Sequence, residues 1–236
     1  MLKRLYEKSE IGFAIAWIVA YVVVMGTLRG NYGDGSLAQL FGIVVFTALS
    51  LMFLHSTNTW QKYGLARWPN GRPYLYFVPL ALICTVNLWA GIAPHFEGLT
   101  QLRAMASMAL IGYIEELVFR GFLFRAMEKD NVTQAIVVSA VTFGAGHIVN
   151  LLTGQASIDT FLQVAYATAI GFAFVMVFHK SGSLWPCIIT HAIVNATSTL
   201  ANHNVPPQSE ALFTYGTAAF LVIVAGGYAW YLHKQR

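Results

Sequence analysis

The chain has 236 residues, of which 57% are hydrophobic and 10% are charged. A soluble domain has about 25% charged residues, most of them on its surface, so a soluble globular fold is excluded. The formal charge is +4, but the basic residues form short clusters between apolar runs, which is typical of a membrane topology signal and not of a nucleic-acid-binding face. We therefore expect a multi-pass protein surrounded by the lipid bilayer, with no nucleic acid partner.

Apolar segments long enough to cross a hydrocarbon core of about 30 Å recur along the whole chain. Gly, Pro, Asn or charged residues separate them. The pattern predicts an all-α fold, a bundle of about eight transmembrane helices near residues 11–28, 37–55, 74–93, 103–125, 133–152, 158–178, 183–201 and 212–232. The connecting segments are too short to fold alone, so we expect a single integral-membrane domain over residues 1–236.

The distribution of Lys and Arg predicts the orientation of this bundle. An even number of spans leaves both termini on one side, and basic residues are enriched in cytoplasmic segments. Arg29 and Arg103 fall on the opposite side from the termini. We therefore expect a cell-membrane protein with its N- and C-termini in the cytoplasm and a functional site entered from the cytoplasm. The basic residues on the side of the termini are Lys3, Arg4, Lys8, Lys62, Arg67, Arg72, Arg125, Lys129, Lys180, Lys234 and Arg236.

Between its terminal residues Arg103 and Arg125, the segment 103–125 contains three charged residues, Glu115, Glu116 and Arg120. Charged side chains inside a membrane are costly, and they commonly line a cavity or take part in function. Glu116 and Arg120 are four residues apart, so they can form an ion pair on one helical face. Glu115 projects about 100° away from Glu116 and has no basic partner on its own helix. Glu115 is therefore the better candidate for a general base.

Two further segments carry polar groups with complementary chemistry. In the segment 133–152, His147 follows Phe143 by four residues and stands among glycines, which allow a close approach of another backbone. In the segment 183–201, His191 and Asn195 are also four residues apart and share one helical face. The three segments together offer a carboxylate, two imidazoles and an amide that could meet inside the bundle.

The strings Glu-Glu-x-x-x-Arg (Glu115, Glu116, Arg120), Phe-x-x-x-His (Phe143, His147) and His-x-x-x-Asn (His191, Asn195), in this order on three helices, resemble the CPBP family of intramembrane proteases. This family contains CAAX-processing enzymes and bacteriocin-processing or Abi relatives. The resemblance covers about residues 100–200, which would be the catalytic core.

The resemblance implies hydrolysis of a peptide bond in a membrane-associated protein or peptide. It implies that Glu115 and His147 activate water and that His191 and Asn195 stabilise the oxyanion. Glu116 and Arg120 would support the helix and could bind a carboxylate of the substrate, and Phe143 belongs to the same supporting set.

The same residues leave a metal site open as an alternative. Two glutamates and two histidines could bind zinc, in which case the ligands would be Glu115, Glu116, His147 and His191. The chain contains no HExxH string, and an oxyanion role would occupy His191. We therefore favour glutamate-type hydrolysis without a cofactor, with zinc as the alternative.

Two other functions are compatible with the same composition. The chain could be a non-catalytic membrane partner that regulates a sensor kinase or confers bacteriocin immunity, as is thought for some relatives. Buried Glu and His residues could also form the relay of a proton-coupled transporter, although the sequence has no inverted repeat. A full set of Glu115, His147, His191 and Asn195 favours the protease.

Overall fold

The computed structural model describes residues 2–69 and 77–235, which form helices joined by short connections. One isolated antiparallel bridge between Ile92 and Ala201 is the extended pairing in these ranges. The all-α prediction is therefore confirmed. The elements are α1 (Leu2–Lys8), α2 (Glu10–Tyr32), α3 (Leu37–Thr57), α4 (Val78–Ile83), η2 (Val86–Leu88), α5 (Gly98–Glu116), η3 (Leu117–Phe124), α6 (Arg125–Glu128), α7 (Val132–Gly146), η4 (His147–Thr153), α8 (Ser157–Ser181), α9 (Trp185–Ser198) and α10 (Pro207–Lys234).

Within residues 2–69 and 77–235, five helical segments are long and apolar enough to cross a membrane. They are α2, α3, α7 continued by η4, α8 and α10, and each corresponds to one of the predicted spans. Polar N-caps fix the starts of three of these helices, because the side chains of Ser9, Ser36 and Asn131 accept hydrogen bonds from backbone N–H groups of the first turn. The long apolar helices make the chain an integral membrane protein.

The other three predicted spans differ from simple transmembrane helices. Residues 98–128 form one continuous rod of α5, η3 and α6 that carries the charged residues, and α9 has only 14 residues. The prediction of one long helix over 74–93 is wrong for its described part, which contains only α4 and η2. The α-helical pattern ends before Thr85, because the N–H groups of Thr85, Leu88 and Trp89 bond to carbonyls three residues back instead of four. Asn87 of η2 donates a hydrogen bond of 2.7 Å to the carbonyl of Val194 on α9. The total of eight spans remains a prediction.

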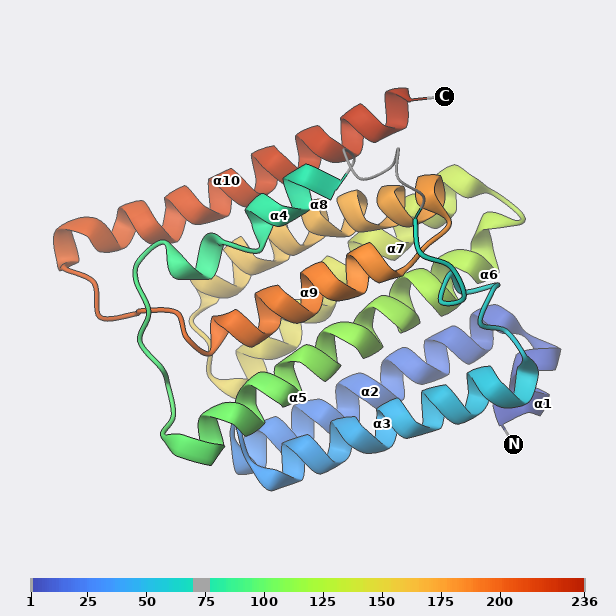
Figure 1. The fold of residues 1–236 in the computed structure, drawn as a ribbon, viewed down its shortest axis with the longest axis horizontal. Helices are drawn as coiled ribbons and strands as arrows, with labels where there is room; N and C mark the ends of the chain where they lie inside the picture. Colours follow the sequence, from blue (N-terminus) through green and yellow to red (C-terminus); the bar gives the residue numbers. More distant parts are fainter. Residues whose placement is uncertain (1, 70–76, 236) are drawn as a thin grey trace.

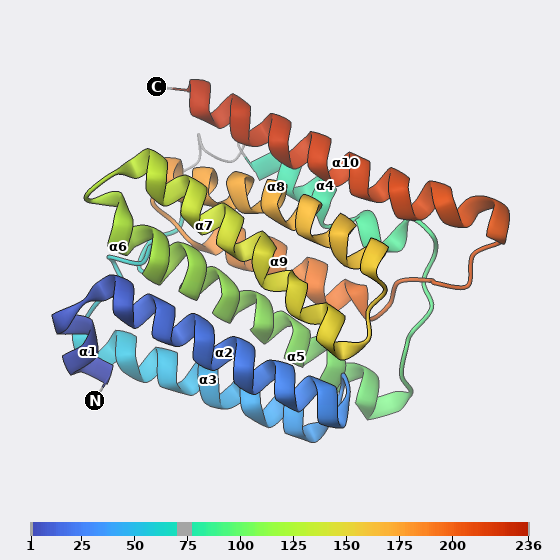
Figure 2. The ribbon, with the colours of Figure 1, turned by 180° about the vertical axis from the view of Figure 1, so that it is seen from behind.

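The rod of α5 and η3 lies in the middle of the bundle, with α2 and α3 on one side and α9 on the other (Figures 1 and 2). Helices α7 and α8 pack together and contact η3, while α10 lies against α8 and α4. Nearly all of η3 is buried. The central rod can therefore present side chains to several helices at once.

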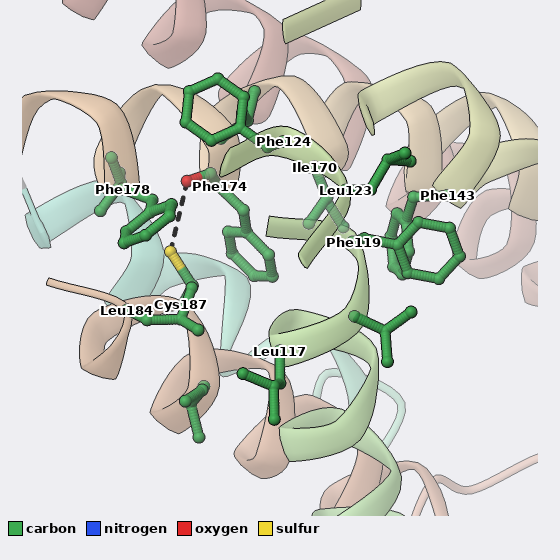
Figure 3. Close-up of a cluster of buried hydrophobic side chains, with 14 of the residues drawn as sticks. Leu117, Phe119, Leu123, Phe124, Phe143, Ile170, Phe174, Phe178, Leu184 and Cys187 are labelled. Carbon is green, nitrogen blue, oxygen red and sulfur yellow. Dashed lines mark hydrogen bonds between the residues drawn. The ribbon is translucent and has the colours of Figure 1, made fainter. Parts of the chain in front are cut away.

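The hydrophobic core gathers around η3, a π-helix, and joins it to α7, α8 and α9. Phe119 of η3 packs edge-on against Phe143 of α7, with ring centroids 5.4 Å apart. Figure 3 shows this cluster, in which the thiol of Cys187 on α9 points toward the backbone carbonyl of Phe174 on α8 and donates to it at 3.3 Å. Single-turn π segments in membrane or soluble helices occur frequently at functional sites, and here the segment directly follows Glu115 and Glu116.

Both termini lie at the same end of the bundle (Figures 1 and 2). Basic residues of the connecting segments gather at this end. Lys62 and Lys129 both contact Glu10 near the N-terminus, at 2.6 and 4.0 Å, and Lys180 donates a hydrogen bond to the carbonyl of Gln235 near the C-terminus. Arg72 and Arg236, which the topology prediction also used, lie outside the described residues. This clustering is consistent with an even number of crossings, and the cytoplasmic orientation of the termini stays a prediction.

Candidate active site

Glu116 and Arg120 form an ion pair in the centre of the bundle. Nη1 of Arg120 lies 3.0 Å from Oε1 of Glu116, and both side chains are fully buried. The guanidinium group stacks over the ring of Phe143, 4.2 Å from its centroid, which is a favourable place for a cation. The i, i+4 spacing therefore predicted the pair correctly. Arg120 has no exposed surface in this structure, and binding of a substrate carboxylate by this pair stays a prediction.

His191 joins both glutamates. Its Nδ1 lies 2.7 Å from Oε1 of Glu116, and its Nε2 lies 3.3 Å from Oε2 of Glu115. Helix α9 therefore meets α5 at the Glu-Glu pair, as the motif order suggested. The contact with Glu116 fixes the orientation of the imidazole ring and leaves Nε2 directed at Glu115.

A glycine on α5 makes this approach possible. A Cβ atom added to Gly112 would lie 2.8 Å from the backbone nitrogen of Ala192 and 2.9 Å from the carbonyl carbon of His191. Small residues commonly allow such close contact between membrane helices. Gly144 has the corresponding role between α7 and α8, where an added Cβ would overlap the side chain of Thr168. The glycines noted beside His147 thus include one that sets a helix–helix distance.

Tyr21 of α2 is a member of the site that the motifs did not reveal. Its hydroxyl group donates a hydrogen bond of 2.7 Å to Oε1 of Glu115, and its ring is buried against Phe46 of α3. Glu115 is therefore held on both sides, by Tyr21 at one oxygen and by His191 at the other. The one sequence signal for Tyr21 was a hydroxyl-bearing residue in the middle of an otherwise apolar segment.

Glu115, His147 and Asn195 line a common cavity of about 150 Å³, which is room for several water molecules. His147 stands where α7 passes into η4, and its Nδ1 lies 3.1 Å from the carbonyl oxygen of Phe143. That contact occupies Nδ1 and leaves Nε2 available to the cavity. His191 is not among the residues that line the cavity, so its position behind Glu115 fits a positioning role better than direct contact with an oxyanion.

The cavity extends from Glu115 toward the end of the bundle opposite the termini. Its lining there includes polar residues from α2, the α2–α3 connection, α3, η4 and α8, namely Arg29, Asp34, Gln39, Asn150 and Gln163. The side chains of Arg29 and Asp34 are 39% and 31% exposed, so this end is open. With the termini in the cytoplasm, the opening would face the exterior. That arrangement is opposite to the cytoplasmic entrance expected from the sequence.

The four candidate metal ligands do not fit zinc in this arrangement. No group of three or more His, Cys, Asp or Glu side chains within residues 2–69 and 77–235 is arranged to hold a metal ion. Oε1 of Glu116 already contacts both Arg120 and His191, and a buried guanidinium beside a metal site would repel the cation. Both ring nitrogens of His191 face carboxylates.

Residues 98–197 match a protein family described as type II CAAX prenyl endopeptidase Rce1-like. This segment contains all three motifs, from Glu115 to Asn195, and it corresponds closely to the catalytic core expected at about 100–200. Comparisons with curated proteins and with solved structures gave no match. Tyr21 and Arg29 lie outside the matched segment, although both line the cavity that it forms.

Proposed function

Because the segment 98–197 belongs to the CPBP family of intramembrane proteases, we propose that this protein hydrolyses a peptide bond in a membrane-associated protein or peptide. The observation that carries the proposal is the cavity in which Glu115, His147 and Asn195, from three different helices, face a common space. A scaffold needs no water-accessible cavity lined by a carboxylate and an imidazole. The family supports a substrate with a membrane-associated segment.

Glu115 is the proposed general base. A water molecule in the cavity transfers a proton to Glu115, and the resulting hydroxide attacks the carbonyl carbon of the scissile bond. The hydrogen bond from Tyr21 and the contact with His191 support this role, because they hold both carboxylate oxygens in a fixed orientation. A base held in place loses less entropy on reaching the transition state.

Asn195 and His147 are the proposed partners of the developing charges. The amide N–H of Asn195 donates to the oxyanion of the tetrahedral intermediate, and His147 orients the attacking water through Nε2. The intermediate collapses when the C–N bond breaks, and the proton held by Glu115 passes to the leaving amine. One water is consumed, one carboxylate and one amine are formed, and Glu115 returns to its starting state. His191 acts through Glu115, which revises the oxyanion role that the family resemblance implies for it.

The proposed location is the cell membrane with cytoplasmic termini. The gathering of Lys62, Lys129 and Lys180 near the two termini supports this orientation. In this orientation the polar opening beside Arg29 faces away from the cytoplasm. A substrate would reach Glu115 from that side or from within the bilayer.

A cleavage assay tests the proposal. Purified protein in lipid is incubated with a mixed library of membrane-associated peptides, and the products are identified by mass spectrometry. The wild-type protein should release defined products, and a His147→Ala variant of the same fold should release none. Absence of cleavage by folded wild-type protein would contradict the proposal and favour the reading as a regulatory membrane partner.

A further inference from the structure

Arg29 stands at the open end of the cavity, on the last turn of α2. Its Nε lies 3.1 Å from Oδ1 of Asp34, and its Nη1 donates to Oδ1 of Asn150 at 3.2 Å. A guanidinium group carries five N–H donors, and these contacts engage two of its three nitrogens. The side chain is 39% exposed, so an anion that enters the cavity can reach it.

Arg29 is the one Lys or Arg side chain in the lining of this cavity within the described ranges. The other arginine of the site, Arg120, is fully buried and paired with Glu116. An anionic group of a bound peptide would therefore meet Arg29 and not Arg120. Asp34 contacts Nε of the guanidinium and Asn150 contacts Nη1, so the group is already oriented before a ligand arrives.

We propose that Arg29 binds a carboxylate of the substrate at the open end of the cavity. This inference rests on the proposed protease function and names a feature of its substrate. Arg is suited to the role because its planar fork matches a carboxylate through two parallel hydrogen bonds. Every unmodified peptide has such a group at its C-terminus, and an Asp or Glu side chain near that end would supply the same chemistry.

The length of α2 indicates how far this carboxylate lies from the reacting bond. Tyr21, which contacts Glu115, and Arg29 are eight residues apart on α2, which corresponds to about 12 Å along the helix axis. An extended peptide spans about 3.3 to 3.6 Å per residue. Because the side chains of Tyr21 and Arg29 add their own reach to this rise, the carboxylate bound by Arg29 would lie on the order of a few residues from the scissile bond.

A variant of Asp34 distinguishes binding of a substrate carboxylate by Arg29 from a purely structural role of Arg29. If Arg29 only ties the α2–α3 connection to η4, removal of either charge breaks the same ion pair and both variants should behave alike. If Arg29 binds a carboxylate, Asp34 competes with that ligand. Loss of Arg29 should then weaken binding of an anionic peptide, and loss of Asp34 should strengthen it.

The test measures binding and cleavage of matched peptides in zwitterionic detergent micelles. One N-acylated hydrophobic pentapeptide is prepared as the free acid, as the C-terminal amide, and as an amide with Glu in the last position. Dissociation constants are measured by calorimetry for wild type, Arg29→Gln, Asp34→Asn and the control Arg103→Gln. Arg103 is a suitable control because it is on α5 outside the cavity lining, where it donates to Thr100.

Wild-type protein should bind the free acid about tenfold more tightly than the amide, as expected for a charge-assisted hydrogen bond. The ratio should fall to about one in Arg29→Gln, rise in Asp34→Asn and stay unchanged in Arg103→Gln. If the Glu-terminated amide binds like the free acid, any carboxylate at this position suffices; if it binds like the plain amide, the site selects the C-terminus. Equal binding of acid and amide by wild type, or an unchanged ratio in Arg29→Gln, would overturn the proposal.

The same measurements distinguish failure of the protease proposal from failure of the proposal for Arg29. If the acid and amide peptides bind with the expected ratio but neither is cleaved, the carboxylate site stands and hydrolysis is contradicted. If both peptides are cleaved at equal rates and bind equally, hydrolysis stands and the role of Arg29 is contradicted.

Discussion

The hydroxyl group of Tyr21 on α2 donates a hydrogen bond of 2.7 Å to Oε1 of Glu115 on α5. This bond joins the N-terminal helices, which carry none of the three motifs, to the carboxylate at the centre of the proposed mechanism. Helix α2 is therefore part of the proposed active site.

Replacement of Tyr21 by Phe should lower kcat about tenfold with little change in KM, because the orientation of Glu115 is lost while the buried ring remains. Tyr113→Phe is the matched control, since Tyr113 on α5 bonds Ser50 and lies outside the cavity lining. Steady-state kinetics of both variants check the prediction. An equal loss in the two variants would mean that Tyr21 has only a packing role.

Gly112→Ala should separate α5 from α9. The added methyl group would lie within 3 Å of the α9 backbone, which cannot move without shifting His191. We expect a loss of about 1 to 3 kcal/mol in the free energy of unfolding together with a large loss of cleavage. Gly226→Ala on α10 is the control, because an added Cβ there meets no atom within 4 Å. Thermal unfolding in detergent and cleavage rates would be measured together, and normal activity in Gly112→Ala would contradict the assigned contact.

The buried pair of Glu116 and Arg120 should behave as a unit. Glu116→Gln leaves a buried guanidinium without its carboxylate, which should cost about 3 to 5 kcal/mol of stability. The double variant Glu116→Gln, Arg120→Met removes both charges and should recover much of that loss. Thermal unfolding of Glu116→Gln, of Arg120→Met and of the double variant measures the three losses of stability and checks this prediction. Additive losses in the double variant would show that the two charges do not interact.

Removal of metal ions should leave cleavage intact. Nη1 of Arg120 and Nδ1 of His191 both lie at Oε1 of Glu116. The charge of the guanidinium would repel a metal ion at this position. We expect the purified protein to retain its rate after dialysis against a strong chelator and to contain less than stoichiometric zinc by elemental analysis. A zinc protease dialysed in parallel should lose its activity, which shows that the chelator removes zinc. Loss of activity that added zinc restores would show that the site rearranges around a metal.

The sequence predicted the parts of this site that depend on local spacing. Four-residue separations on a helix identified the pair of Glu116 and Arg120 and set Glu115 apart from it, because helix geometry is fixed by the backbone. The long apolar segments also identified the five helices suited to cross a membrane. These features need no knowledge of how the helices pack.

Features that depend on packing were missed. Tyr21 and Arg29 come from α2, and no sequence spacing relates them to Glu115 on α5. The end of α4 before Thr85 was missed because the segment 74–93 stays mostly apolar, and hydropathy does not indicate the change there to backbone hydrogen bonds that reach three residues back. The direction of the cavity opening was missed because it depends on how several helices pack around the cavity, whereas the distribution of basic residues indicates only on which side of the membrane each connection lies.

The central claim is that Glu115 is the base that activates water, and one comparison tests it most directly. Glu115→Gln removes the carboxylate and keeps its shape, while Glu97→Gln makes the same change at the exposed start of α5. Both variants and wild type are reconstituted in the same lipid, and cleavage of one identified peptide is followed by mass spectrometry. We expect the cleavage rate of Glu115→Gln to fall by a factor of about 10² to 10⁴ and Glu97→Gln to retain the wild-type rate. A folded Glu115→Gln protein that cleaves the peptide within a few-fold of wild type would contradict the central claim.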